Sequence, residues 1–298
     1  MSEINLFSIT DTVKERASSE VILEKELQNL IEQNMETFFG VRFLKSEYSI
    51  TNGRMDSIGI DENNSPVIFE YKRSQNENVI NQGLFYLDWL LDHKADFKLL
   101  VIEKMGMKAA EHIDWSVPCV ICIARDFTKY DVHAVNQMQR NIKLVSYRKY
   151  DNDLILFEHL NAPTIKPNSN DEISDNDTKS NPQKSHVEKL ASASETMKKL
   201  YYSICDFIES LGDDIVQNQL KLYLAYKKVQ NMVCVEIYNK QIMLYLKLNP
   251  ETVALEKGFT RDMRGIGHYG TGDLQVAIKG ASDFERAKPL LERAYNEA

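Results

Sequence analysis

A polar segment at residues 161–186 constrains the fold of this 298-residue sequence more than any other feature. The segment contains three prolines and five asparagines, and Ile165 and Ile173 are its only sizeable apolar residues. Such a composition cannot bury enough apolar surface to offset the entropy that is lost on ordering. We therefore expect a flexible linker here, which separates a domain at 1–160 from a smaller domain at 187–298.

The composition excludes several classes of protein. No run of about 18 apolar residues is present to cross a membrane, and the N-terminus lacks the basic start and apolar block of a secretory signal. Four cysteines in this length do not make a disulfide framework. We therefore expect a cytoplasmic protein without a membrane partner. The net charge of −8 excludes a basic protein that coats nucleic acid, but it is compatible with an acidic, metal-binding nuclease site.

Apolar periodicity predicts that the first domain is a mixed α/β sheet flanked by helices. Three segments repeat apolar residues at helical spacing, and seven shorter runs have the alternation or the continuous apolar character of strands. The predicted helices cover residues 19–34, 77–93 and 128–140, and the predicted strands cover residues 41–50, 54–61, 66–73, 97–103, 117–124, 142–150 and 153–160.

The second domain is predicted to be a small α+β unit with an antiparallel sheet. A helix over 187–211 precedes several strand-like runs, a glycine-rich loop and a strand at 274–279. Ser282 and Glu285 fit an S-x-x-E capping box for a closing helix. Pro289 falls inside that helix and predicts a kink or a later start.

Three charged residues on two neighbouring predicted strands indicate a metal site. Glu70 and Lys72 are two residues apart on one strand, so their side chains share a face. Asp56 lies on the preceding strand, and a short hairpin would bring it beside Glu70. Two adjacent carboxylates repel each other unless a cation lies between them, and oxygen ligands favour Mg²⁺ or Mn²⁺. Lys72 could orient water or neutralise charge in a transition state.

A Glu-x-Lys pair alone is more often a harmless ion pair on a strand. Here the pair follows the apolar run Val67-Ile68-Phe69, which is typical of a central strand. A charged pair at the end of a central strand needs a reason, and Asp56 supplies a second carboxylate. The combination favours the metal site.

The same residues resemble the core motif of the PD-(D/E)XK nuclease superfamily, most closely its NucS-like and RecB-like domains. Asp56 and Glu70-Tyr71-Lys72 match the motif, while Met55 stands where the name of the superfamily has proline. Gln82 and Tyr86 are similar to its Q-x-x-x-Y helix, because residues four apart share a helix face.

An acidic residue on the first helix extends the resemblance. The superfamily has such a residue in an E-x-x-L pattern, which Glu24 fits with Leu27, and Glu26 is the alternative. The resemblance covers residues 18–160 and implies a restriction-endonuclease-like fold.

The resemblance also implies a role for each matched residue. Asp56 and Glu70 would bind Mg²⁺ or Mn²⁺ together with the Tyr71 carbonyl, and Lys72 would position the attacking water. Glu24 would hold a second metal or a metal-bound water.

The sequence offers four further candidate residues, one that would support the site and three that would contact the substrate. Gln82 would support the site and Tyr86 would face the substrate. Arg54 and Arg73 flank the site and are candidates for contacts with backbone phosphates. Solvated charges at a strand edge are an equally good interpretation of both arginines.

The second domain resembles a C-terminal domain family of unknown function that follows NucS-like nuclease domains. The matching segments are Gly258–Asp262 and Gly267–Leu274. Arg261, Arg264 and His268 lie near glycine-rich backbone and are candidates for a phosphate-binding loop. A glycine-rich connection with solvated charges is the alternative.

Two other motifs carry no function in our interpretation. Cys119 and Cys122 form a CxxC without a second ligand pair for zinc, so buried apolar cysteines are expected. Residues 265–270 fit G-x-G-x-x-G, but a strand rather than a helix follows, which excludes a dinucleotide-binding fingerprint.

The sequence therefore predicts a metal-dependent endonuclease that acts on nucleic acid, with DNA favoured, in repair or defence. The alternatives are a non-cleaving nucleic-acid-binding or regulatory protein that keeps the nuclease fold, and a protein-interaction scaffold. The intact set of Asp56, Glu70 and Lys72 favours the enzyme. The sequence leaves open the choice of DNA or RNA and whether the protein forms a homodimer.

Overall fold

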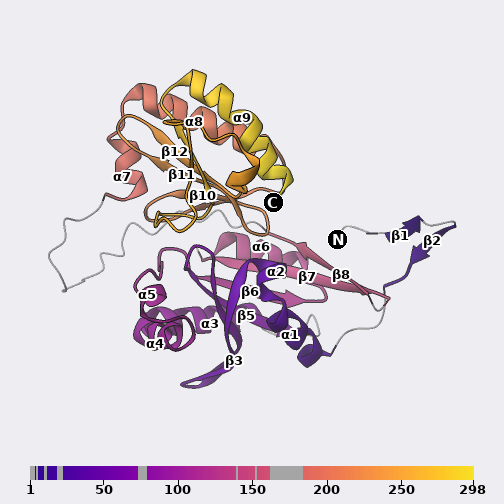
Figure 1. Cartoon of the computed structure of the whole chain (residues 1–298). Coiled ribbons are helices and arrows are strands. Elements are labelled where there is room, and N and C mark those ends of the chain that lie inside the picture. The colour runs from indigo at the N-terminus through magenta and orange to yellow at the C-terminus, as the bar shows by residue number, and fades with distance from the viewer. Residues whose placement is uncertain are drawn as a thin grey trace. The chain divides into compact units, whose positions relative to one another are not determined.

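The computed structural model describes residues 4, 6–9, 12–18, 23–72, 79–138, 140–151, 153–161 and 184–298 (Figure 1). The chain divides into two compact units, of which the first comprises residues 1–60, 66–113 and 118–163, and the second comprises residues 61–65, 114–117 and 164–298. Most of the predicted linker lies outside the described residues, so its flexibility stays a prediction. Among the described residues, no helix has the length and apolar character needed to cross a membrane.

A six-stranded mixed sheet forms the first unit, with the strand order β3-β4-β5-β6-β7-β8. The strands are β3 (Val41–Ile50), β4 (Gly53–Asp61), β5 (Pro66–Lys72), β6 (Cys119–Ala124), β7 (Ile142–Tyr150) and β8 (Leu154–His159). The β4–β5 and β7–β8 pairs are antiparallel, whereas β5–β6 and β6–β7 are parallel. The predicted mixed α/β fold is confirmed, and six of the seven predicted strands are present.

Helices cover both faces of this sheet. The helices of the unit are α1 (Glu24–Gln33), α2 (Met35–Phe39), α3 (Val79–Asp92), α4 (Lys94–Met105), α5 (Met107–Ala110) and α6 (Lys129–Gln137). Leu27 and Ile31 of α1 pack in one core with Phe69 and Tyr71 of β5. Helix α3 packs on the opposite face, where Gly83 comes close to β6. A separate hairpin of β1 (Leu6–Ile9) and β2 (Val13–Arg16) precedes α1.

The predicted strand at 97–103 is wrong, because this run lies within helix α4. Phe97, Leu100 and Val101 are buried, whereas Leu99 is 63% exposed. Buried residues at i, i+3 and i+4 are the pattern of a helix with one apolar face. The continuous apolar run concealed this spacing, because the exposed Leu99 is as apolar as its buried neighbours.

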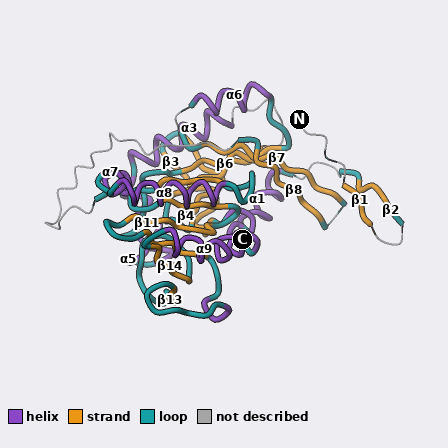
Figure 2. The backbone as a smooth tube through the Cα atoms, turned by 90° about the horizontal axis from the view of Figure 1, so that it is seen from above, coloured by secondary structure: helices purple, strands orange, loops and turns teal. Residues whose placement is uncertain are grey.

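The second unit is built on a six-stranded antiparallel sheet, with the order β13-β14-β12-β11-β10-β9. The strands are β9 (Val216–Gln219), β10 (Leu224–Lys227), β11 (Asn231–Ile237), β12 (Ile242–Leu246), β13 (Thr260–Asp262) and β14 (Leu274–Ile278). Helices α8 (Glu195–Glu209) and α9 (Ala281–Asn296) bury their apolar residues against one face of this sheet (Figures 1 and 2). The short helices α7 (His186–Ala191) and η1 (Pro250–Thr252) complete the unit.

Two details of the second unit differ from the expectation. The helix predicted over 187–211 is two helices, because the Ser194 hydroxyl accepts the Met197 N–H and starts α8. The capping box at Ser282 is absent, since α9 begins one residue earlier and Asp283 accepts the Lys279 N–H instead. The helix continues through Pro289.

Candidate active site

Asp56 and Glu70 face each other where β4 and β5 stop pairing. The antiparallel register runs to Ser57 opposite Phe69. Beyond this pair, the backbone N–H groups of Asp56 and Tyr71 donate to carboxylate side chains and not to the backbone of the opposite strand. The Asp56 N–H donates to Glu70 Oε1 over 3.2 Å, and the Tyr71 N–H donates to Asp56 Oδ2 over 3.0 Å. Both carboxylates therefore converge at the end of the hairpin.

The surroundings of this carboxylate pair disfavour negative charge. Glu70 is only 1% exposed. Burial and, after it, the adjacent charge of Asp56 together raise the pKa of Glu70 to about 8. Burial also raises the pKa of Asp56, although the hydrogen bond from the Tyr71 N–H and the charge of Lys72 oppose this effect. A pair of this kind holds a proton at neutral pH unless a cation replaces it.

The donor set fits a small divalent cation that keeps much of its water. Asp56 and Glu70 supply hard oxygen ligands, and within the described parts of the chain no cluster of three or more His, Cys, Asp or Glu side chains is present. Mg²⁺ is usually bound through one or two carboxylates and several waters, whereas structural zinc requires four N or S ligands. The residues present therefore suit Mg²⁺ or Mn²⁺ better than zinc.

Lys72 lies near the carboxylate pair and is close to Glu24. Lys72 Nζ is 3.9 Å from Glu24 Oε1, and the lysine side chain is 13% exposed. The positive charge of Lys72 opposes part of the rise in the pKa of Asp56 and of Glu70. Glu24 is the first residue of α1, whereas Glu26 is exposed and is directed elsewhere. The structure thus brings Glu24 rather than Glu26 toward the lysine.

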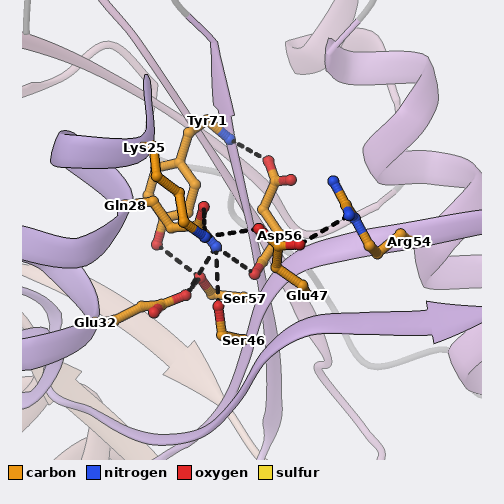
Figure 3. A network of polar contacts seen from close by, with 9 residues as sticks. All are labelled: Lys25, Gln28, Glu32, Ser46, Glu47, Arg54, Asp56, Ser57 and Tyr71. Carbon is orange, nitrogen blue, oxygen red and sulfur yellow. Dashed lines mark hydrogen bonds and ion pairs between the residues drawn. The ribbon is translucent and has the colours of Figure 1, made fainter. Parts of the chain in front are cut away.

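Gln28, which the sequence analysis missed, connects α1 to the carboxylate strand (Figure 3). Its side chain is 5% exposed. The amide Nε2 donates to the backbone oxygen of Asp56 over 2.8 Å and to Glu32 Oε1 over 2.9 Å. Lys25 Nζ donates to Gln28 Oε1 over 3.2 Å. The backbone at Asp56 is therefore held by a side chain of α1.

Glu32, Ser57 and Tyr71 continue this network beneath the sheet (Figure 3). The Ser57 hydroxyl donates to Glu32 Oε1 over 2.6 Å, and the Tyr71 hydroxyl donates to Ser57 Oγ over 3.2 Å. Tyr71 is fully buried, so its ring fixes β5 directly beside Glu70. The sequence did contain a signal, since Glu24, Gln28 and Glu32 repeat every four residues on one helix face.

Tyr86 lies beside the carboxylates, whereas Gln82 does not contact them. Tyr86 is 7% exposed, and its hydroxyl accepts the Arg54 N–H over 3.4 Å. Burial raises the pKa of Tyr86, and the charges of Glu70 and Asp56 raise it further. Gln82 is exposed on α3, and within the described residues no hydrogen bond joins it to the carboxylate pair. Its supporting role stays a prediction.

The flanking arginines have different positions. Arg54 is exposed and its guanidinium is 2.8 Å from Glu47 Oε2. Its positive charge also lowers the pKa of Asp56. A phosphate contact by Arg54 would have to compete with Glu47. Arg73 lies outside the described residues, so its role stays a prediction.

The proposed phosphate loop of the second domain is less favourable than its sequence suggested. Arg264 donates to both Asp262 and Glu251, at 2.7 and 2.8 Å. A guanidinium that is already paired with two carboxylates has little charge left for a phosphate. Arg261 is exposed on β13, and the His268 ring lies against Tyr245. Phosphate binding at this loop stays a prediction that these contacts disfavour.

A full-length relative establishes the family. The chain is 32% identical over 285 residues to an uncharacterized protein from Haemophilus influenzae, with 92% of this chain and 93% of the relative covered. The chain belongs to the same family as this protein.

Two family models match separate parts of the chain. Residues 23–112 match the endonuclease NucS C-terminal domain, and residues 187–298 match DUF5655, a domain of unknown function. The first match contains both carboxylates, Lys72 and α3. The resemblance to a NucS-like nuclease followed by a domain of unknown function is thereby confirmed.

Solved structures with a similar arrangement are remote. An EndoMS complex with double-stranded DNA is 17% identical, with a TM-score of 0.29, and the match covers 48% of this chain and 64% of that one. A repair endonuclease from Pyrococcus abyssi is 16% identical, with a TM-score of 0.28 and coverage of 49% and 64%. The chain thus spans less than two thirds of either protein.

Proposed function

We propose that the chain is a metal-dependent endonuclease that hydrolyses phosphodiester bonds in DNA. The observation that supports this most is the convergence of two carboxylates and Lys72 at the end of a central hairpin. The match of residues 23–112 to the endonuclease NucS C-terminal domain adds independent support. Asp56 and Glu70 would hold the metal, which is Mg²⁺ or Mn²⁺ in this proposal.

Each residue of the site has a distinct part in this reaction. A divalent cation supplies Lewis acidity toward the scissile phosphate. Glu70 and Asp56 would hold it through their deprotonated carboxylates. Lys72 orients the attacking water and stabilises the negative charge that develops on the phosphoryl oxygens. Glu24, which approaches Lys72, keeps the ammonium in place between the helix and the strand.

The residues beneath the sheet position this machinery. Gln28 holds the backbone of Asp56, and Tyr71 anchors the strand between Glu70 and Lys72. A displacement of one carboxylate by about 1 Å would lower the rate strongly, because catalysis depends on the near-attack geometry. Tyr86 closes the other side of the site and presents its ring toward Gly53.

The test is cleavage of a panel of single-stranded, duplex, flap and mismatched DNA, with matched RNA, in Mg²⁺ or Mn²⁺. We expect cleavage of DNA by the full chain that EDTA abolishes. Asp56→Asn should remove it, whereas Asp92→Asn, at an exposed aspartate on α3, should not. Metal-independent cleavage, or equal activity of the two variants, would overturn the proposal. Binding of DNA without cleavage in either metal would favour the non-cleaving alternative.

A further inference from the structure

Two short segments from the first half of the sequence belong to the second unit. Residues 61–65 form the turn between β4 and β5, and residues 114–117 precede β6. The turn lies inside the match to the NucS domain, although it groups with residues 164–298. It closes the hairpin that carries Asp56 and Glu70, so the contacts that hold the turn also act on that hairpin.

The backbone of the turn is fixed by contacts of its own. The Asp61 carboxylate accepts the N–H groups of Asn63 and Ser65, each over 2.8 Å. Asn64 has a left-handed backbone conformation, with φ of 61°, which asparagine tolerates better than most residues do. The side chains of Glu62 and Asn63 make their contacts elsewhere in the second unit.

The carboxamide of Asn63 is buried against two donors. Asn63 is 4% exposed. Its Oδ1 accepts the Tyr223 hydroxyl over 2.9 Å and also accepts Nδ2 of Asn231. Asn231 is 1% exposed, and its Nδ2 donates to Thr271 Oγ1 over 3.1 Å as well. Because hydrogen bonds are directional, two donors on one oxygen fix the position of the Asn63 side chain and do not merely cover it.

Glu62 adds a charged contact to the turn. The Asn231 N–H donates to Glu62 Oε1, and Lys227 Nζ lies 3.7 Å from the same oxygen. The side chains of Lys227 and Glu62 are 9% and 18% exposed. Loss of one partner of such a pair leaves a poorly solvated charge and is strongly unfavourable. The pair therefore favours this arrangement of the turn over others.

The segment before β6 gives a second attachment. The Asp114 N–H donates to the Asn64 carbonyl over 2.9 Å. Val117 packs with Tyr223 in an apolar cluster. Strand β6 begins at Cys119 and is the parallel neighbour of β5. The second unit therefore holds the chain just before both β5 and β6 begin.

A paired ladder connects the turn to the carboxylates. Four residue pairs of β4 and β5 lie in register between them, and the last is Ser57 opposite Phe69. The turn sets the register of a hairpin, and a slip by one residue moves every side chain of a strand to the opposite face. A slip here would separate Asp56 from Glu70. The contacts on the turn therefore select the register in which the two carboxylates face each other.

We propose that Tyr223, Lys227 and Asn231 are positioning residues for the nuclease site, and that they act by holding the turn at residues 61–65. The catalytic part of this proposal rests on the proposed nuclease function. It gives a role to residues 187–298, which match the domain of unknown function. Removal of these residues would leave Glu62 and Asn63 without their partners.

The first test is hydrogen–deuterium exchange of the full chain in EDTA, followed by mass spectrometry of peptides that cover β4 and β5. This readout needs neither metal nor cleavage. We expect Asn231→Ala to speed exchange about tenfold in the peptides that contain Asp56 or Tyr71, with β7 and β8 unchanged. Asn239→Ala, at an exposed asparagine between β11 and β12, is the matched control. Faster exchange confined to the turn, no change, or an equal change in the control would overturn the proposal.

A gentler variant keeps this test valid if Asn231→Ala does not fold. Tyr223→Phe removes one of the two donors to Asn63 Oδ1 and keeps the buried ring. It should speed exchange in the peptides that contain Asp56 or Tyr71 by about threefold. An unchanged exchange rate in the folded Tyr223→Phe variant would also overturn the proposal.

The second test is steady-state cleavage by the folded variants. Displacement of the carboxylates in Lys227→Met should lower kcat by about tenfold and leave KM unchanged, whereas Lys240→Met, at an exposed lysine between β11 and β12, should change neither. The double variant of Asn63→Ala and Asn231→Ala should lose less than the sum of the two single losses, because the two residues share one contact.

The outcomes separate this proposal from the nuclease function. Strictly additive losses, or a change confined to KM, would overturn the positioning role. A wild type that cleaves nothing would overturn the proposed nuclease function, and the exchange rates of Asn231→Ala and Tyr223→Phe would then decide whether the second unit positions the hairpin.

Discussion

Glu70 and Glu236 are both glutamates on central strands, both 1% exposed, and yet their neighbours differ in kind. Glu70 faces a second carboxylate, whereas Glu236 faces two tyrosine hydroxyls and a lysine. The first arrangement has an excess of negative charge that a proton or a bound cation removes. The second is already neutralised, because Lys189 Nζ lies 3.8 Å from Glu236 Oε1. The neighbours of a buried carboxylate, rather than its burial, therefore determine which ligand it suits.

Lys72→Ala should have the largest effect on the cleavage rate at the site of Asp56 and Glu70. Removing this charge should lower the cleavage rate by about 10²-fold or more. The measurement is single-turnover cleavage of a duplex that the full chain cuts. Lys45→Ala, at an exposed lysine on β3, is the control. A Lys72→Ala variant that retains activity with the same metal dependence would show that this lysine is only an ion-pair partner of Glu24.

A divalent metal should stabilise the protein by binding at Glu70 and not at Glu236. At a Mn²⁺ concentration about 100 times its Kd, binding adds roughly 2.7 kcal/mol to the free energy of unfolding. We expect this increase in the wild type and in Glu236→Gln, but not in Glu70→Gln. Thermal unfolding followed by circular dichroism, with and without Mn²⁺, measures it. An equal increase in all three proteins would place the metal elsewhere.

The pH dependence of the free energy of unfolding should also reveal the buried Glu70. Between the ordinary pKa of 4.5 and its folded value of about 8, Glu70 holds a proton that the unfolded chain releases. Its contribution is therefore complete below pH 4.5 and is lost as the pH rises toward 8. In EDTA, Glu70→Gln should be more stable than the wild type at pH 8 by on the order of 2 kcal/mol and nearly equal to it at pH 4.5. Urea unfolding at both pH values tests this, and a constant difference would contradict it.

Gln28→Ala should have the smallest effect of this series. The variant removes the Gln28 donor from the Asp56 carbonyl, whereas Glu32 keeps the Ser57 hydroxyl. This loss should cost about 1 kcal/mol of stability and lower the cleavage rate by about tenfold through displacement of Asp56. Gln33→Ala, at an exposed position at the end of α1, is the control. A loss of stability without a change in the rate would limit Gln28 to a structural role.

The sequence was sufficient for the hairpin that carries the carboxylates. The continuous apolar run before Glu70 and the turn formers after Asp61 predicted both strands within one or two residues of their limits. The pairing of Asp56 with Glu70 followed from that register, and the structure places the two side chains together. The helix α4 was not predictable in the same way, because apolar residues on its exposed side removed the periodicity.

The supporting residues were harder to predict for a different reason. Gln28 acts through a backbone carbonyl on another element, and such a contact leaves no motif beyond the four-residue spacing on α1. The partners of Glu236 were not predictable from the sequence, because Lys189 lies on α7 and Tyr245 on β12, so no short window contains them. His268 was noted for its glycine-rich surroundings, whereas its stacking on Tyr245 is a property of the folded sheet.

Gly83 has a consequence for the genetics of this family. A Cβ at this position would lie 2.7 Å from Val120 Cγ1, so α3 lies on the sheet without room for a methyl group. Every missense change that one nucleotide can make in a glycine codon introduces a Cβ. Any such allele would push α3, and with it Tyr86, away from the carboxylates. A mutational screen for loss of activity should therefore recover this codon alongside those of Asp56 and Lys72, and temperature-sensitive alleles should be found among its smallest replacements.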